Sequence, residues 1–269
     1  MSLPAPSPDR TALVTGASSG IGAEIARELA RRGQHVTLVA RSESKLAALA
    51  EELSNGAGAA VLPTDLADRA ARAALPGRVE ATGRAVSILV NNAGLSTMGP
   101  VKRGNPDAEL NMIEVDVAAV ADLCTRFLPG MTDRGNGAIL NVASTAAFQP
   151  IPGQAGYGAA KAFVLSYTRA LAAELRGQGV TVSALCPGPV ETGFGEAAGI
   201  TQDEAEAALP KFMWEPADAV ARCGVDALAA GRTVAIPGAA NRVSALLATM
   251  TPKQLLVPLM ATRHPGLRE

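Results

Sequence analysis

Ser144, Tyr157 and Lys161 are the side chains of this sequence whose types and spacing could move a proton to or from a substrate oxygen. Tyr157 and Lys161 are four residues apart, so on a helix both project from the same face. A free tyrosine has a pKa of about 10, and a neighbouring lysine ammonium favours the phenolate and lowers that pKa. Ser144 can hydrogen-bond a carbonyl oxygen. The three residues therefore predict acid–base chemistry at an alcohol or a carbonyl group.

Other uses of these residues are less well supported by the sequence. A Tyr-x-x-x-Lys spacing alone is a common coincidence on helices, although the chain has only two tyrosines. A hydrolase that used Ser144 as its nucleophile would need a histidine base. The only histidines are His35, at the start of an expected strand, and His264, near the end of the chain. The same shortage of ligands argues against a metal site.

A glycine-rich turn precedes these residues by more than a hundred positions, in the segment Thr15-Gly16-Ala17-Ser18-Ser19-Gly20-Ile21-Gly22. Glycines let the backbone approach a pyrophosphate without an obstructing Cβ, and the following helix points free N–H groups at it. No Gly-Lys-Ser/Thr follows, so the turn is not a P-loop. The residues expected to hold a dinucleotide here are Gly16, Ser18, Ser19, Gly20, Ile21 and Gly22.

The end of the next expected strand indicates which dinucleotide is bound. A carboxylate at this place would accept hydrogen bonds from the ribose hydroxyls of NAD. The sequence instead has Arg41, whose guanidinium suits bidentate contact with the 2′-phosphate of NADP(H). The alternative is a solvated surface arginine with no ligand. NADP(H) is the predicted cofactor.

Short β-branched runs alternate with longer Ala/Leu-rich runs along the chain, which predicts an α/β fold with a parallel sheet covered by helices on both faces. We expect strands at 11–15, 35–40, 59–63, 86–90, 138–142, 181–185 and 234–236. We expect helices at 21–32, 42–53, 108–128, 156–176 and 217–229, and a poorer helix after the third strand that Pro76 interrupts. No linker or repeat divides residues 1–269, so we expect a single domain.

The core of that domain is expected at 10–237, followed by an apolar C-terminal extension at 238–269. Pro252 and Pro258 interrupt the apolar segment 241–260 of this extension. Three interpretations are open: it covers the substrate cleft, packs on a second subunit, or rests on a membrane surface. Packing on the same protein is favoured, because long apolar stripes are usually core.

Composition excludes several classes of protein. The 24 basic and 25 acidic residues leave a formal net charge of −1, which does not suit a nucleic-acid binder. The three cysteines are widely spaced, which argues against disulfides and zinc sites. No run approaches the roughly 18 apolar residues of a membrane helix, and residues 1–10 do not resemble a signal peptide. A cytoplasmic protein is expected.

The motifs taken together resemble the short-chain dehydrogenase/reductase family, in the family's order and near its usual spacings, from about residue 11 to residue 237. The segments that carry the resemblance are Thr15–Gly22, Asn91-Asn92-Ala93-Gly94, Ser144, Tyr157-Gly158-Ala159-Ala160-Lys161 and Pro187-Gly188. The resemblance implies a Rossmann-like, doubly wound parallel sheet of about seven strands. It also implies hydride transfer with Tyr157 as the acid or base, while Lys161 binds the nicotinamide ribose and lowers the tyrosine pKa.

Further cofactor contacts follow from the same resemblance. Asp65 and Leu66 match positions beside the adenine, and Val190 and Thr192 match residues that hold the carboxamide. The remaining matched positions are Asn91, Asn92, Ala93 and Gly94 after the fourth strand, and Pro187 and Gly188 after the sixth. Family members usually pair through the helices that here carry Asp116 and Tyr157, which implies a homodimer or homotetramer.

Asp116 departs from the family pattern. An asparagine commonly stands at this position, 28 residues before Ser144, and completes a catalytic tetrad. A carboxylate here could hold Lys161 more firmly protonated. The departure is also the one feature that favours an alternative function, an NADP(H)-binding sensor or partner protein with little turnover.

The substrate is the least readable part of the sequence. Apolar side chains on loops beyond the strand ends indicate an apolar small-molecule carbonyl or alcohol. Simple packing of a lid explains each of them equally well. These residues are Leu95, Met98, Phe148, Phe194, Phe212, Met213 and Trp214.

Overall fold

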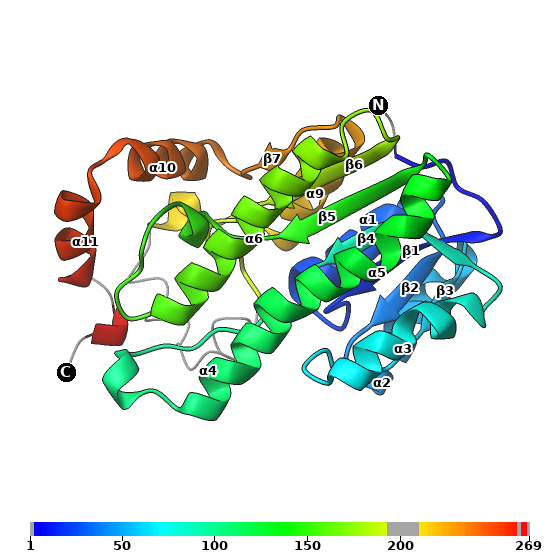
Figure 1. Ribbon diagram of the computed structural model, residues 1–269, viewed down its shortest axis with the longest axis horizontal. Helices are drawn as coiled ribbons and strands as arrows, with labels where there is room; N and C mark the ends of the chain where they lie inside the picture. Colours follow the sequence, from blue (N-terminus) through cyan, green and yellow to red (C-terminus); the bar gives the residue numbers. More distant parts are fainter. Residues whose placement is uncertain (1–2, 193–209, 263–264, 268–269) are drawn as a thin grey trace.

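The computed structural model describes residues 3–192, 210–262 and 265–267, and in these residues seven strands form one parallel sheet. Its order is β3-β2-β1-β4-β5-β6-β7, which confirms the predicted Rossmann-like, doubly wound fold (Figure 1). The strands are β1 (Arg10–Thr15), β2 (Val36–Val39), β3 (Ala59–Val61), β4 (Ala85–Asn91), β5 (Gly137–Val142), β6 (Val180–Leu185) and β7 (Val234–Ala235).

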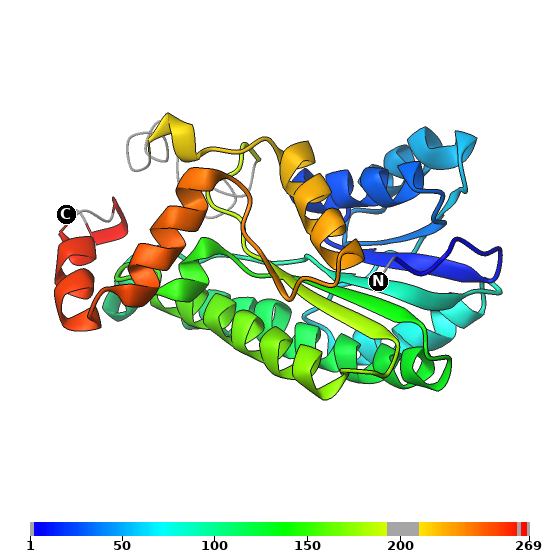
Figure 2. The same ribbon diagram turned by 90° about the horizontal axis from the view of Figure 1, so that it is seen from above.

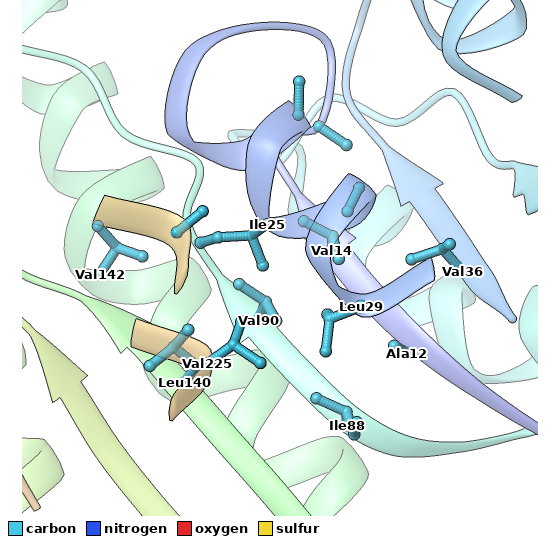
Figure 3. Packing of buried hydrophobic residues seen from close by; sticks show 14 of the residues in the cluster. Ala12, Val14, Ile25, Leu29, Val36, Ile88, Val90, Leu140, Val142 and Val225 are labelled. Carbon is cyan, nitrogen blue, oxygen red and sulfur yellow. The ribbon is translucent and has the colours of Figure 1, made fainter. Parts of the chain in front are cut away.

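Helices cover both faces of this sheet (Figure 2). One face carries α1 (Gly20–Arg31), α2 (Glu43–Glu52) and α9 (Ala217–Ala229). The other carries α3 (Arg69–Glu80), α5 (Ala119–Asp133) and α6 (Ala155–Glu174). Figure 3 shows how Ile25 and Leu29 of α1 lie against strand side chains such as Val14 and Val90. Strands buried on both faces explain why their sequences are continuously apolar rather than alternating.

The predicted helix over 108–128 is not continuous. The segment consists of α4 (Pro106–Ile113), a π-helical turn over Glu114–Ala118, and α5. A π turn inserts one extra residue into the helical repeat, and such turns are frequent at functional sites. The side chains of Val115 and Asp116 are buried within it. The turn matters because it directs Asp116 toward Lys161.

The prediction that Pro76 interrupts the third helix is wrong, because α3 continues through it to Glu80. The Asp68 side chain caps the helix by accepting hydrogen bonds from the N–H groups of Ala70 and Ala71. Leu75 is fully buried on the inner face. Capping and burial together offset the backbone hydrogen bond that a proline removes.

The C-terminal extension forms α10 (Ala239–Met250), α11 (Lys253–Ala261) and a 3-10 turn over Pro265–Leu267, at the end of the molecule remote from β3 (Figure 1). Pro252 separates the two helices as expected, whereas Pro258 lies inside α11. The favoured interpretation, packing of the apolar residues on the same protein, is wrong for the large side chains that are exposed, whereas Leu256, Val257 and Met260 are half-buried. The inner face of α10 buries only Asn241, Ala245 and Ala248.

Candidate functional site

Ser144, Tyr157 and Lys161 come together at the carboxyl end of β5. Ser144 follows this strand and caps a short 3-10 turn, where its Oγ accepts from the Ala146 N–H at 3.1 Å. Tyr157 and Lys161 lie one turn apart on α6, and the Ser144 hydroxyl hydrogen-bonds the Tyr157 side chain. Lys161 Nζ lies 5.6 Å from the centroid of the Tyr157 ring. The structure thus brings together the three residues that the sequence predicted.

Lys161 is held in place by two oxygen atoms. Only 5% of its surface is exposed, and Nζ donates to the Val142 carbonyl oxygen at 3.2 Å. Asp116 Oδ2 lies 3.0 Å from the same nitrogen. A buried ammonium needs partners of this kind, because removing it from water is costly. Lys161 therefore has little freedom to move away from Tyr157.

Asp116 is fully buried, and its second oxygen accepts from the Leu95 N–H at 2.7 Å. Burial raises the pKa of Asp116, although the Lys161 ammonium and the Leu95 N–H act in the opposite direction. Burial alone would lower the pKa of Lys161, but the Asp116 carboxylate raises it above its usual value. The pair accordingly stabilises the charged ammonium.

The pKa of Tyr157 reflects competing influences. Burial raises it, the Lys161 ammonium and the Ser144 hydrogen bond lower it, and the Asp116 carboxylate adds to the rise. The sequence correctly predicts the direction of the lysine effect. Burial outweighs that effect, however, so the pKa of Tyr157 stays above that of a free tyrosine.

The glycine-rich turn connects β1 to α1 and has the backbone shape that a phosphate cradle needs. Gly16 and Gly20 have φ angles of +64° and +54°, in the left-handed region that favours glycine. A Cβ on Gly22 would lie 2.3 Å from both Asn92 Nδ2 and the Gly16 carbonyl oxygen. The turn can close in this way only if Gly22 has no side chain.

Replacing Gly22 by alanine is expected to destabilise the protein by about 1–3 kcal/mol, since a methyl group forced into this packed turn must displace Asn92 or the backbone. Thermal unfolding measures the loss of stability, and NADPH fluorescence titration measures weakened binding. Gly77→Ala on α3 is the control, because a Cβ there meets nothing within 4 Å. That substitution is expected to add about 0.5–1 kcal/mol of stability. Equal melting temperatures for both variants would contradict the argument.

Thr15 joins this turn to the segment after β4. Its Oγ1 accepts from the N–H groups of Asn92 and Ala93, at 2.9 and 3.1 Å, and donates to the Val90 carbonyl oxygen at 3.1 Å. Asn92 Nδ2 donates to the Thr15 carbonyl oxygen at 3.0 Å. The structure therefore places Asn92 and Ala93 against the glycine-rich turn. Thr15 begins the predicted glycine-rich motif, but its positioning role was not predicted.

Asn91 differs from the expectation that it lines the cofactor. It is 3% exposed, and its Nδ2 donates to Asn141 Oδ1 at 2.8 Å inside the core. Successive side chains of a strand point to opposite faces, so Asn91 faces the core while Asn92 faces the turn. Gly94 lies beside the ion pair, where a Cβ would be 3.0 Å from Asp116 Oδ2.

Arg41 and Asp65 lie at the ends of neighbouring strands. Thr64 N donates to the Ala40 carbonyl oxygen at 2.9 Å, which brings the two strand ends together. Arg41 is exposed and makes no ion pair with the described residues. Asp65 Oδ1 accepts from the Ala67 N–H at 3.0 Å, and Leu66 is buried beside it. These residues occupy the edge at which the sequence places the adenosine half of the cofactor.

The segment after β6 packs against the C-terminal extension through a residue that the sequence analysis missed. A Cβ on Gly188 would lie 2.3 Å from Asn241 Oδ1, and Asn241 Nδ2 donates to the carbonyl oxygens of Met213 and Pro237 at 3.0 and 3.2 Å. The available signal was an asparagine at the start of an apolar run. Thr192 lies close to the glycine-rich turn, because its Cγ2 would be 3.1 Å from a Cβ on Gly20.

Val190, predicted together with Thr192, forms an isolated parallel bridge with Glu215. This bridge ties the segment after β6 to the residues just before α9. Pro187 is buried, and its carbonyl oxygen accepts from the Ser144 hydroxyl at 3.4 Å. The Pro187-Gly188 motif is therefore in direct contact with Ser144.

The expected substrate residues are spread over several loops. Leu95 adjoins the site through its N–H group, and Gln154 Nε2 donates to Ser96 Oγ at 3.0 Å nearby. Phe212 is 73% exposed. Phe148 and Met98 border the C-terminal extension, while Phe194 lies outside the described residues. Ser96 and Gln154 add polar groups to a region that the sequence analysis regarded as apolar.

The part of the chain that the structure describes has neither a cluster of metal ligands nor a membrane-spanning helix. Among the described residues, no three His, Cys, Asp or Glu side chains gather in a way that could hold a metal ion. None of the described helices is long and apolar enough to cross a membrane. His264, like Phe194, lies outside the described residues.

The fold and the site together define an NAD(P)(H)-dependent oxidoreductase that acts on alcohol or carbonyl groups. Residues 10–203 match the short chain dehydrogenase family. This chain belongs to that family.

Relatives with different cofactors share its structure. The chain is 38% identical over 205 residues to a short chain dehydrogenase of Pseudocercospora fijiensis, an alignment that covers 72% of this chain and 66% of the relative. A short-chain dehydrogenase from Sphingobium yanoikuyae in complex with NADPH superposes with a TM-score of 0.79 at 34% identity, over 88% of this chain and 92% of the other. A Burkholderia phymatum enzyme in complex with NAD gives the same TM-score and coverage at 28% identity. Both dinucleotides therefore occur among similar structures.

Proposed function

We propose that this protein is an NADP(H)-dependent reductase or dehydrogenase of apolar carbonyl or alcohol substrates, with Tyr157 as the general acid and base. The observation that carries the proposal is the joint placement of Tyr157, Ser144 and the buried Lys161 at the end of β5. Proton transfer by a positioned side chain is the chemistry this arrangement supports best.

The residues present fit a dinucleotide. Gly16 and Gly20 give the turn its left-handed backbone, and α1 begins at Gly20 with no side-chain cap on its first N–H groups among the described residues, so these groups can donate to a phosphate. When bound, the nicotinamide supplies or accepts the hydride. Arg41 is free of carboxylate partners among the described residues, which leaves its guanidinium available for a 2′-phosphate.

In the reductive direction Tyr157 donates its phenolic proton to the substrate oxygen, and in the oxidative direction its phenolate removes that proton. Ser144 hydrogen-bonds the same oxygen and keeps it in line with the Tyr157 hydroxyl. Lys161 stabilises the phenolate through its ammonium charge. Its contacts with Val142 and Asp116 keep that charge in place during the reaction.

Asp116 acts as a positioning residue in this proposal. Its carboxylate links Lys161 Nζ, at 3.0 Å, to the Leu95 N–H, at 2.7 Å, and so joins the lysine to the segment that borders the substrate. It also keeps a negative charge near Tyr157. An asparagine would keep a hydrogen-bonding link without that charge.

Replacing Asp116 by asparagine is expected to lower the pKa of both Tyr157 and Lys161, because the carboxylate raises both values. Oxidation requires the phenolate, so its acidic limb should move to lower pH. Reduction requires the phenol, so its basic limb should also move to lower pH. Profiles of kcat/KM against pH in both directions test this. Asp107→Asn, an exposed carboxylate on α4, is the control, and an unshifted D116N profile would refute the coupling.

The test of the function is NADPH consumption across ketones, aldehydes, quinones and 3-oxoacyl compounds, with NADH in parallel. Turnover that prefers NADPH supports the proposal. An alternative is an NADP(H)-binding sensor with little turnover. The buried Asp116–Lys161 ion pair favours it, because the Asp116 carboxylate offsets the lysine charge that would stabilise the Tyr157 phenolate. Tight NADPH binding without turnover on a wide panel, in both directions, would favour the sensor.

A further inference from the structure

Helix α10 exposes its large apolar side chains to solvent and buries small or polar ones, which is the reverse of the usual arrangement in a surface helix. The residues it buries are Asn241, Ala245 and Ala248, which are small or polar. Val243, Leu246, Leu247 and Met250 repeat at helical spacing on the opposite face, with exposed fractions of 57%, 58%, 58% and 72%. Surface helices normally bury their large aliphatic residues and expose polar ones. This inversion indicates that the outer face meets a partner.

The next helix also exposes large apolar side chains. Leu255 and Leu259 of α11, one turn apart, are 69% and 53% exposed. Figures 1 and 2 place α10 and α11 together at one end of the molecule. We define the tail face as the six exposed side chains Val243, Leu246, Leu247, Met250, Leu255 and Leu259. Large apolar side chains exposed together on neighbouring helices mark interaction sites.

Charge around the tail face distinguishes between possible partners. The C-terminal extension, residues 238–269, contains four Arg or Lys residues and one Glu, whereas the rest of the chain has 20 basic and 24 acidic residues. Arg242 is exposed, one helical turn before Leu246. A second copy related by a two-fold axis would bring like charges together. An anionic lipid surface would instead complement them.

The tail also contacts the loops that follow three of the central strands. Asn241 Nδ2 donates to the Met213 carbonyl oxygen, beyond β6, and Lys253 Nζ donates to that of Phe148, beyond β5, at 3.3 Å. A Cβ on Gly266 would lie 2.9 Å from Met98 Cγ, beyond β4. The tail therefore lies against the edge of the sheet where the catalytic residues stand. A partner on the tail face would sit next to the substrate entrance.

We propose that the tail face binds the surface of an anionic lipid bilayer, with α10 and α11 lying in the headgroup region and the substrate entrance close to the membrane. Such helices bind through their apolar face together with attraction between cations and anionic lipids. The docking does not depend on the proposed reaction. It would give the enzyme access to carbonyl substrates dissolved in the lipid.

The experiment uses the full chain and co-sedimentation with vesicles of phosphatidylcholine alone or mixed with phosphatidylglycerol. Wild-type protein is expected to bind the mixed vesicles, more weakly at high salt and much more weakly without phosphatidylglycerol. The double substitution Leu246→Glu and Leu247→Glu should reduce binding at least about tenfold. Arg242→Glu should also reduce it. Leu110→Glu on α4, which is 61% exposed, is the control and should bind like wild type.

Three results would overturn the proposal. One is wild-type protein that does not bind the mixed vesicles at low salt. Another is a double variant that binds as well as wild type. The third is a double variant whose molar mass, measured by light scattering, corresponds to a smaller oligomer than wild type. In that case the tail face would bind a second copy of the chain. Thermal unfolding checks that the double variant folds. If it does not fold, the double substitution Arg242→Glu and Val243→Glu takes its place.

Discussion

Tyr157→Phe is expected to lower kcat by about 10²–10⁴-fold, because it removes the only proton that the proposed mechanism delivers to the substrate oxygen. The ring remains, so packing beside Lys161 and binding of the dinucleotide should change little. Initial rates of NADPH oxidation measure the loss, and fluorescence titration measures NADPH binding. A defect in kcat with unchanged binding is the expected pattern.

The chain offers a matched control for this substitution. Tyr167, the only other tyrosine, lies on the same helix α6 and stacks on Phe163 with ring centroids 5.6 Å apart. Tyr167→Phe removes the same atom from the same helix but away from the catalytic group, and should leave kcat unchanged. Full activity of Tyr157→Phe would mean that another group supplies the proton. Equal losses in both variants would indicate disturbance of α6 rather than loss of an acid.

The sequence predicted the fold well because its signals are local and repeated. Each strand is a short apolar run, and each crossover carries a helical pattern, so the order of elements leaves few arrangements of a parallel sheet. Strand β5 over Gly137–Val142 lies within one residue of its expected bounds. The continuation of α3 through Pro76 was missed because burial of Leu75 is a tertiary effect that local propensity does not report.

The candidate site was predictable where its residues share one element or one turn. Tyr157 and Lys161 are placed by helical spacing alone, and Gly16 to Gly22 by one turn. An effect of Asp116 on Lys161 was expected only from the family resemblance, because their contact depends on a π turn that no sequence spacing indicates. Asn241 was missed for a similar reason, since its partners Gly188 and Met213 are distant along the chain.

The tail shows a different limit of sequence analysis. Its apolar composition predicted core packing, but composition does not say which face of a helix turns inward. Small residues on the inner face, such as Ala245 and Ala248, allow α10 to lie close to the protein and leave Leu246 and Leu247 outside. That distribution becomes visible only when burial is known for each residue.

Arg41→Asp is expected to lower kcat/KM for NADPH by about 10–100-fold, the effect of losing a charge-assisted hydrogen bond to a phosphate and placing a like charge beside it. Use of NADH should be retained or improved, because a carboxylate at the end of β2 can accept from the ribose hydroxyls. Rates with both cofactors, measured at the same ionic strength, give the ratio that defines the preference. A parallel fall with both cofactors would mean that Arg41 supports the fold and does not bind phosphate.

The substitution Lys45→Asp tests whether Arg41 acts by direct contact with the 2′-phosphate or only by adding to the positive electrostatic potential around it. Lys45 is an exposed cation on α2, close to Arg41 along the chain, and its replacement by aspartate changes the net charge by the same amount. A guanidinium that contacts the phosphate acts through short hydrogen bonds, whereas the field of an exposed charge is screened by salt. Arg41→Asp should therefore remain defective with NADPH at high salt, while any effect of Lys45→Asp should fade. If both defects fade together, Arg41 contributes only to the field, and the preference for NADPH must come from other residues.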